Sequence, residues 1–388
     1  MTDAAVAQTD AADSTAAGRD LGDQVATAFG GGPPDALIVF ASARYNYQAL
    51  LQALNAVCHP ALLVGCSSAG EFSGTTPQVG SASAIALRSS TIRFAAGLAQ
   101  GVQADQGLAA HHLVAAYQGM HRQDYQYRSA LVLTDALAGH TDNLAEQLNL
   151  QTAGMYQFFG GGAGDDALFQ RTHVFFGTHA YTDAVVSLEI LSNTPIGVGV
   201  SHSWRPASKP MRVTEADGMC LISLNAEPAA DVFAEHAKAT GQRFDQAAPL
   251  PFFLHNVLGI DTGLGYRLRV PLAIQAGGAI TCAAEVPVGA TVAIMEAAAH
   301  GPLENASLAA AAALRQIAGH QPKVGLFFDC VATRLRLGRD FGLELDSIAE
   351  ALAPAPFAGC NTYGQIVRAD GQFGGFHNCT AVVCVLSE

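Results

Sequence analysis

Basic residues are scarce in this sequence. Its 388 residues include 20 lysines and arginines against 33 aspartates and glutamates, which gives a net charge of −13. The chain contains no run of basic side chains. Nucleic acids and anionic membrane surfaces attract proteins mainly through clustered lysine and arginine. The composition therefore argues against both as partners.

The sequence also lacks segments that would place it in or across a membrane. Its most apolar stretch, 185–200, is interrupted by Glu189, Asn193 and Pro195, so it predicts strands rather than a membrane span. The chain does not start with the basic residues and apolar block of a signal peptide. We therefore expect a cytoplasmic protein whose acidic, alanine-rich residues 1–20 form a disordered tail.

None of the eight cysteines forms a C-x-x-C pair. Without that spacing, a zinc site or a disulfide framework is not expected, and buried reduced thiols are. Cys66 and Cys360 invite comparison with nucleophiles, but the sequence assigns them no histidine or acidic partner. The Gly-x-Ser-x-Gly pattern of hydrolases also fails, because Ala69 stands where glycine is needed. We predict that the protein is not an enzyme.

One pattern occurs three times: an apolar strand, a helix, and a second strand that breaks at a glycine-rich turn. The units span 36–64, 130–159 and 324–358, and their turns span 65–71, 160–166 and 359–365. A short helical crossover favours parallel, right-handed pairing of the two strands. We predict an α/β protein, α+β in parts, with two related halves built on β-α-β units and mixed sheets flanked by helices.

The glycine-rich turns lie at the carboxyl ends of the predicted strands, where α/β proteins bind ligands. Glycine lets backbone N–H groups approach a ligand closely. The turns would converge on one cleft if the halves pack about a pseudo-twofold axis. The alternative is that the glycines only form tight strand ends required by packing. Because the second turn has no cysteine, we interpret Cys66 and Cys360 as small packing residues beside the cleft.

Three motifs together resemble the FIST family. They are the turn 65–71, the turn 160–166 and the ending Phe376-His377-Asn378-x-Thr380. The resemblance runs from about residue 35 to the end, and it implies a FIST N-terminal domain at 35–205 and a FIST C-terminal domain at 206–388. It also implies a sensory role, in which a small ligand is bound and a signal passes to a partner.

We predict that the ligand site consists of the turns and a few nearby polar side chains. Its members are Gly65, Cys66, Ser67, Ser68, Gly70, Glu71, Gly161, Gly162, Gly164, Asp165, Asp166, Arg205, Asn361, Tyr363, Gly364 and Asn378. Two alternatives stay open. Asp165 and Asp166 can cap a helix instead of binding a ligand or metal ion, and Arg205 can form an exposed ion pair instead of binding a ligand carboxylate.

A stand-alone member of this size is similar to bacterial nitric-oxide-sensing haemoproteins. That similarity implies haem b as cofactor, nitric oxide as signal and a histidine kinase as partner. One neutral imidazole suffices to hold haem iron, and His377 is the predicted ligand, with His173, His202 and His255 as competitors. The alternative for His377 is a hydrogen bond to the loop backbone. The alternatives for the protein are an amino-acid or metabolite sensor without haem, or an interaction adaptor, and a homo-oligomer fits any of them.

Overall fold

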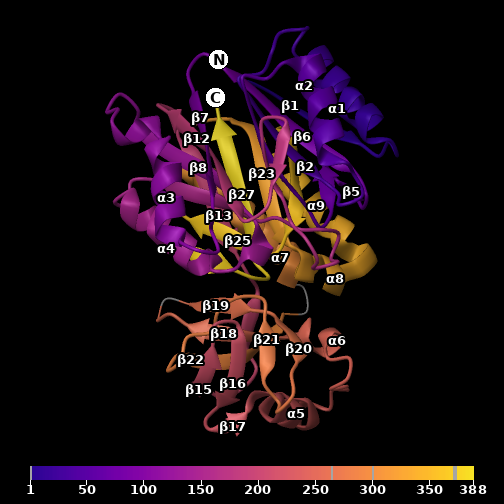
Figure 1. Cartoon of the computed structure of the whole chain (residues 1–388), viewed down its shortest axis with the longest axis vertical. Helices are drawn as coiled ribbons and strands as arrows, with labels where there is room; N and C mark the ends of the chain where they lie inside the picture. The colour runs from indigo at the N-terminus through magenta and orange to yellow at the C-terminus, as the bar shows by residue number, and fades with distance from the viewer. Residues whose placement is uncertain (1, 264, 299–300, 370–373) are drawn as a thin grey trace.

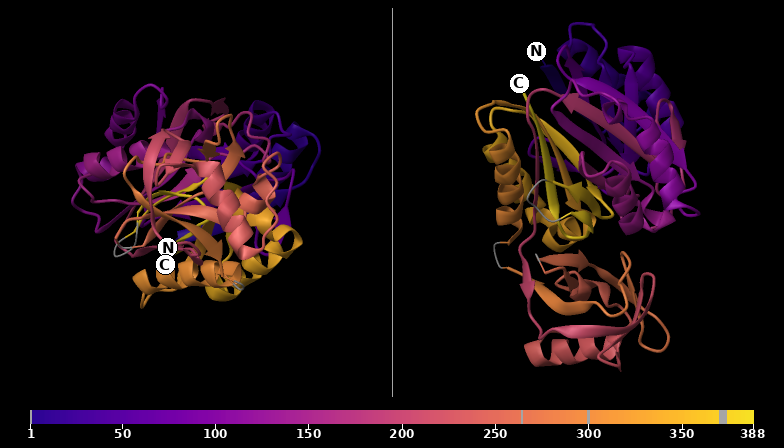
Figure 2. Two further views of the ribbon diagram at one scale, coloured as in Figure 1. Left: turned by 90° about the horizontal axis from the view of Figure 1, so that it is seen from below. Right: turned by 90° about the vertical axis from the view of Figure 1, so that its left-hand side faces the viewer.

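The structure is a computed structural model that describes four stretches of the chain, residues 2–263, 265–298, 301–369 and 374–388. A large α/β body lies above a smaller domain (Figure 1). The chain enters the small domain at β14 (Trp204–Pro206) and leaves it after β22 (Thr291–Ala297). The two ends of the chain lie close together on the large body, far from the small domain (Figures 1 and 2). Within the described stretches, no helix is long and apolar enough to cross a membrane.

All three predicted β-α-β units are present in the large body. They are β2 (Ala36–Ala41), α2 (Tyr47–Cys58) and β3 (Leu62–Ser67); β8 (Tyr127–Thr134), α4 (Thr141–Gln151) and β9 (Gln157–Gly162); and β23 (Pro322–Cys330), α9 (Phe341–Leu352) and β24 (Phe357–Thr362). The two strands of each unit pair in parallel. The α/β class, with mixed sheets flanked by helices, is confirmed.

Each unit forms the middle of its own six-stranded sheet, and the three sheets share one strand order. Two antiparallel strands flank the first strand of each unit: β6 (Ala82–Ser89) and β1 (Thr2–Thr9), β12 (Ala184–Ser192) and β7 (Arg93–Gln100), and β27 (Ala381–Ser387) and β13 (Ile196–Ser201). A hairpin flanks the second strand. The hairpins are β4 (Glu71–Ser73) with β5 (Thr76–Gln78), β10 (Val174–Phe176) with β11 (His179–Tyr181), and β25 (Gln365–Arg368) with β26 (Gly375–His377).

The three sheets exchange these hairpins in a cycle. The hairpin that follows β3 pairs with β24, the one that follows β9 pairs with β3, and the one that follows β24 pairs with β9. Each unit therefore completes the sheet of another unit. The three units are therefore related by a pseudo-threefold arrangement, and the pseudo-twofold axis considered for two halves is not what relates them.

The core lies where the inner faces of the three sheets meet. Each unit contributes a buried phenylalanine there, Phe40, Phe159 and Phe328. The Phe328 ring lies 5.6 Å from Phe40 and 6.3 Å from Phe159, measured between centroids. The outer faces are covered by the helix pairs α1 (Ser14–Ala28) with α2, α3 (Gln106–Ala115) with α4, and α7 (Gly301–Gln316) with α9.

One glycine in each unit is required by the close approach of the paired parallel strands. A Cβ atom on this glycine would lie about 2 Å from the carbonyl oxygen of the residue with which it pairs. The distances are 2.0 Å for Gly65 and Val39, 2.1 Å for Gly160 and Val132, and 1.7 Å for Gly359 and Phe327. Real Cβ atoms do not come that close to an oxygen. At these positions the glycine serves packing, which explains why it recurs in all three units.

The expected disordered tail over residues 1–20 is wrong. β1 pairs with β6 along its whole length, and Asp13 caps α1 by accepting a backbone N–H bond. The small residues of this stretch allow close packing, since a Cβ atom on Gly18 would lie 2.2 Å from the carbonyl oxygen of Leu50. Alanine-rich composition therefore reflects helix packing here and not disorder.

The small domain is a nine-stranded antiparallel sheet with α5 (Ala229–Thr240) on the side away from the large body (Figure 1). Its other elements are β15 (Met211–Asp217), β16 (Cys220–Leu224), β17 (Glu227–Pro228), α6 (Leu250–Phe253), β18 (Asn256–Asp261), β19 (Tyr266–Arg269), β20 (Pro271–Ile274) and β21 (Ile280–Cys282). The end of this domain that carries β19, β20 and β21 faces the large body (Figure 1). There it meets α8 (Val331–Leu337) and the short 3-10 helix η2 (Ala136–Ala138).

Candidate functional site

The three glycine-rich turns meet at the carboxyl ends of the parallel strands. Three backbone hydrogen bonds of 2.9 Å join the turns in a ring. The N–H of Gly164 donates to Ser67 O, the N–H of Ala69 donates to Asn361 O, and the N–H of Tyr363 donates to Gly162 O. The side chains of Cys66, Ser67 and Ser68 are fully buried beside this ring. The turns converge as expected, but their backbones bind one another directly.

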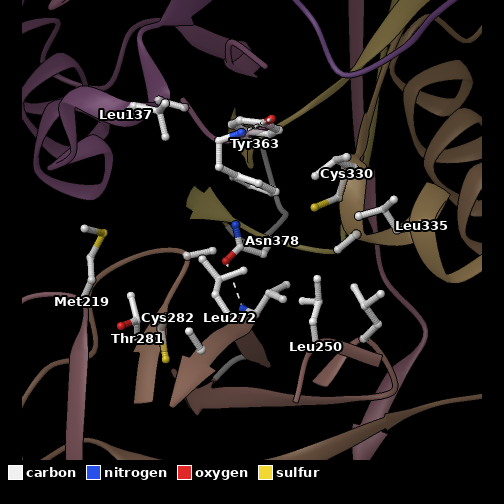
Figure 3. Close-up of a pocket in the computed structure, with 18 of the residues that line it drawn as sticks. Leu137, Met219, Leu250, Leu272, Thr281, Cys282, Cys330, Leu335, Tyr363 and Asn378 are labelled. Carbon is white, nitrogen blue, oxygen red and sulfur yellow. Dashed lines mark hydrogen bonds between the residues drawn. The ribbon is translucent and has the colours of Figure 1, made fainter. Parts of the chain in front are cut away.

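A cavity of about 450 Å³ lies between the large body and the small domain (Figure 3). Residues from 136–139 and 330–335 form one wall, together with Tyr363. Residues from 270–273 and 281–283 of the small domain form the opposite wall. The first wall follows directly after β8 and β23, so the cavity occupies the position where α/β proteins bind ligands.

The walls of the cavity are mainly apolar, and part of the apolar surface is open to water. Leu137, Phe169, Met219 and Leu335 line the cavity while remaining 41–44% exposed. Large apolar side chains that are exposed and gathered in one place mark binding surfaces. Sequence reasoning missed all four, because an isolated leucine in a loop or short helix carries no local signal of a ligand site.

Within the described chain, two members of the predicted ligand set line this cavity. Asn378 accepts a 3.2 Å hydrogen bond from the Val270 N–H of the small domain through Oδ1. Its amide nitrogen points the opposite way, toward Tyr363 of the large body (Figure 3). Tyr363 donates its hydroxyl proton to Asp165 and stacks on Phe169 with 4.4 Å between ring centroids. Burial and the bond to Asp165 raise the pKa of Tyr363, so the hydroxyl stays neutral. The ring of Tyr363 and the amide of Asn378 therefore form part of the cavity wall.

Asp165 holds the loop that carries Phe169. Its buried carboxylate accepts the backbone N–H groups of Phe169, Gln170 and Arg171 at 2.7–2.8 Å, in addition to the Tyr363 hydroxyl. Phe169 has a φ of 53°, in the left-handed region that non-glycine residues seldom occupy. No α-helix follows directly, yet the carboxylate satisfies N–H groups as a helix cap would. Asp165 therefore positions the cavity wall from behind.

Two domain models of one known family match the chain. The FIST N domain matches residues 35–227, and the FIST C domain matches residues 229–368. The chain belongs to the FIST family. FIST domains are sensory domains that bind small ligands in signalling proteins. The two matches meet at β17, just before α5, so each FIST domain supplies part of the small domain and part of the large body.

None of the curated proteins matches this FIST protein in sequence. Among solved structures, it is weakly similar to cyanuric acid hydrolase from A. caulinodans, with 9% identity, full coverage of both chains and a TM-score of 0.34. It also matches PurLQS from Thermotoga maritima and T. maritima PurL complexed with AMPPCP, with 10% and 11% identity and TM-scores of 0.24 and 0.23. Those two matches cover the whole FIST chain and 72% of each of the other chains. Similarity at these TM-scores carries no argument about fold or function.

Two other predicted carboxylates of the FIST protein are bound within the large body. Asp166 accepts from the Ser42 hydroxyl at 2.7 Å. Glu71 is fully buried and accepts from the Ser68 hydroxyl and from the Ser81 hydroxyl and N–H. Burial outweighs these bonds and raises the pKa of Glu71 to about 7. Both carboxylates fasten the turns to the body, and neither lines the cavity.

Arg334 holds the first turn and was missed by the sequence reasoning. Its guanidinium donates to Ala69 O at 2.9 Å, to Asn361 Oδ1 at 3.2 Å and to Gln78 O at 3.2 Å. A Cβ atom on Gly70 would lie 1.1 Å from Nη1, so the glycine makes room for this side chain. The only sequence signal is an arginine in a helix after the third strand, and that signal does not specify a partner 265 residues away.

Arg205 and His377 lie away from the cavity. Arg205 forms an exposed ion pair with Glu296 at 2.9 Å, the alternative considered above. His377 is buried in β26, and burial together with Arg269 and Arg267 lowers its pKa well below the ordinary range. A neutral imidazole can bind iron, but among the described residues the cavity wall includes no histidine. The residues present therefore do not fit a haem that lies in this cavity and is held by His377.

A buried ion pair joins the small domain to the large body near the cavity. Arg269 of β19 is 1% exposed and donates to Asp142 of α4 at 2.7 Å. It also donates to the backbone oxygens of Glu285 and Phe376, at 2.8 and 3.1 Å. Arg267 binds the second Asp142 oxygen at 3.2 Å. These contacts fix how the two walls of the cavity face each other.

Proposed function

We propose that this FIST protein senses an apolar small molecule, which binds in the cavity between the large body and the small domain. The observation that carries the proposal is the group of half-exposed apolar side chains, Leu137, Phe169, Met219 and Leu335, around an apolar cavity. Water in contact with these side chains is released when an apolar ligand covers them, which favours binding.

The size and polarity of the cavity specify the ligand further. A volume of about 450 Å³ lies within the range of small-molecule sites, roughly 300–1,000 Å³. The Asn378 amide and the Thr281 hydroxyl are among its few polar groups. An apolar molecule with one or two hydrogen-bonding atoms matches this lining.

The position of the cavity gives ligand binding a route to a signal. The ligand touches Leu335 and Tyr363 of the large body and Leu272 of the small domain at once. A ligand that binds one relative placement of the two parts better than another shifts the population toward that placement. A partner that contacts both parts responds to that shift. The partner is a histidine kinase or another signalling protein, or a second copy of the chain.

The narrower version, in which haem b binds and reports nitric oxide, has its own test. The cavity does not favour haem, because no histidine is among the described residues of its wall and His377 is buried away from it. A visible spectrum of protein purified with haem supplied decides it, because stoichiometric haem gives a Soret band that shifts with nitric oxide. An amino-acid ligand at the turns is also disfavoured, because Ser67, Ser68 and Asn361 are buried in the ring.

Titration with the apolar fluorophore N-phenyl-1-naphthylamine tests the main proposal. The wild-type protein is expected to bind it with a saturable rise in fluorescence. Leu335→Asp should weaken binding at least tenfold, because it places a carboxylate in an apolar wall. Leu308→Asp is the matched control, since Leu308 is also an exposed helical leucine but lies in α7, away from the cavity. Equal affinities of the two variants would contradict the proposal.

A further inference from the structure

Two cysteines lie together behind the wall of the cavity. Cys330 ends β23 and lines the cavity, and its sulfur lies on the cavity side of the strand (Figure 3). Cys379 lies two residues beyond β26 and is buried. The two residues pack in the same buried cluster, and their side chains interact with each other. We call Cys330 and Cys379 the thiol pair.

The surroundings of the thiol pair favour a thiolate on Cys330. The bond from the Cys379 thiol and the backbone N–H groups of Cys379 and Ala332 lower the pKa of Cys330 to about 7, against the effect of burial. The pKa of Cys379 is raised well above its ordinary value, chiefly because its proton is shared with Cys330. Burial raises the pKa of the neighbouring Asp329 carboxyl, so a negative charge there does not oppose the thiolate. One thiol is prepared to react, and the other keeps its proton beside it.

Cys282, on the opposite wall of the cavity, lacks this arrangement. It is also buried and lines the cavity, but burial raises its pKa to about 12. The cavity therefore presents one activated thiol and one inert thiol to the same ligand.

We propose that the thiol pair is oxidised to a disulfide by an apolar organic hydroperoxide bound in the cavity. The inference rests on the proposed function, because it takes the cavity as the ligand site. An apolar cavity selects an apolar oxidant, and two adjacent thiols supply the two electrons that the O–O bond accepts.

The reaction balances without any other reagent. The Cys330 thiolate attacks the terminal oxygen of R–O–O–H, the O–O bond breaks, and the alkoxide takes the proton lost by Cys330 to become R–OH. Cys330 is then a sulfenic acid. The Cys379 sulfur attacks the Cys330 sulfur, the S–S bond forms, and hydroxide leaves with the proton of Cys379 as water. One hydroperoxide and two thiols give one alcohol, one water and one disulfide.

The position of Cys379 connects this reaction to the small domain. Its neighbour Asn378 accepts the N–H of Val270 at 3.2 Å, and Asn378 donates its own N–H to Leu268 O at 3.4 Å. Cys379 itself has a φ of 52°, which non-glycine residues seldom adopt. A new bond at Cys379 acts on this tight segment and hence on the contact between the two parts of the protein.

The test treats reduced full-length protein with cumene hydroperoxide or, as a small polar control, hydrogen peroxide, and follows the products by mass spectrometry. We expect a Cys330–Cys379 disulfide that forms at least ten times faster with cumene hydroperoxide at equal concentration. Cys58→Ser removes a buried thiol of α2 that does not line the cavity, and it should react like the wild type. Cys330→Ser should form no disulfide, and Cys379→Ser should stop at a Cys330 sulfenic acid that dimedone traps.

Several results would overturn the inference: no disulfide in the wild type, equal rates with the two oxidants, or an unchanged product in Cys330→Ser. The wild-type result does not depend on whether a variant folds. Titration of the same sample with N-phenyl-1-naphthylamine separates this inference from the proposed function. Binding of the fluorophore without disulfide formation removes only the thiol reaction, whereas loss of both removes the ligand site as well.

Discussion

Replacement of Glu71 by glutamine should remove a defined part of the pH dependence of stability. Burial raises the pKa of Glu71 from 4.5 to about 7 in the folded protein. The folded state therefore binds a proton that the unfolded state has released between these pH values. The stabilisation is fully present below pH 4.5 and is lost as the pH rises through 7. At about 1.4 kcal/mol for each pKa unit, ionisation of Glu71 costs the folded protein about 3 kcal/mol by pH 8.

Urea unfolding of the wild type and of Glu71→Gln at pH 4.5, 6 and 8 measures this effect. The free energy of unfolding of the wild type should fall relative to the variant by about 3 kcal/mol across the series, because other titrating groups are common to both proteins. Glutamine keeps an oxygen for the Ser81 N–H and a donor for the Ser68 hydroxyl. Glu350→Gln makes the same charge change at an exposed site of α9 and serves as the control. Parallel curves for the wild type and Glu71→Gln would refute the reasoning.

Two further predictions concern the contacts that hold the fold together. Asp142→Ala leaves the charge of Arg269 buried without its carboxylate partner. The variant should lower the free energy of unfolding, measured in urea, by about 3–5 kcal/mol. A loss below about 1 kcal/mol would show that the ion pair does not hold the two parts together. Gly359→Ala places a Cβ atom 1.7 Å from Phe327 O and should destabilise the protein by more than about 4 kcal/mol, whereas Gly342→Ala in α9 has room and should stabilise it by about 0.5 kcal/mol. Similar thermal stabilities for these two alanine variants would contradict the packing role of the repeated glycine.

The β-α-β units could be predicted because each depends on local patterns. Apolar runs followed by helical spacing specify a strand and a helix within about 30 residues, as in β2 and α2. The hairpin exchange could not be predicted, because β4 pairs with β24, nearly 300 residues further along the chain. The threefold closure of the sheets follows from those distant pairings, which leave no local signal in the sequence.

The candidate site was predicted only in part, for a related reason. The turns converge, but the glycine at position 65 of the first turn is explained by the Val39 oxygen that it must approach, and no property of the sequence reveals that contact. Tyr363 and Asn378 do line the cavity. Leu137 and Leu335 are recognisable only after the small domain is placed against them, since each looks like an ordinary exposed leucine by itself.

Hydrogen–deuterium exchange with and without a saturating apolar ligand, N-phenyl-1-naphthylamine, tests the central claim most directly. The account predicts slower exchange in two segments at once, residues 136–139 of the large body and residues 270–273 of the small domain, because both line the cavity. Residues 229–240 of α5, on the far side of the small domain, should be unchanged. Protection confined to one part of the protein, or unchanged exchange in both segments, would contradict a ligand site between them.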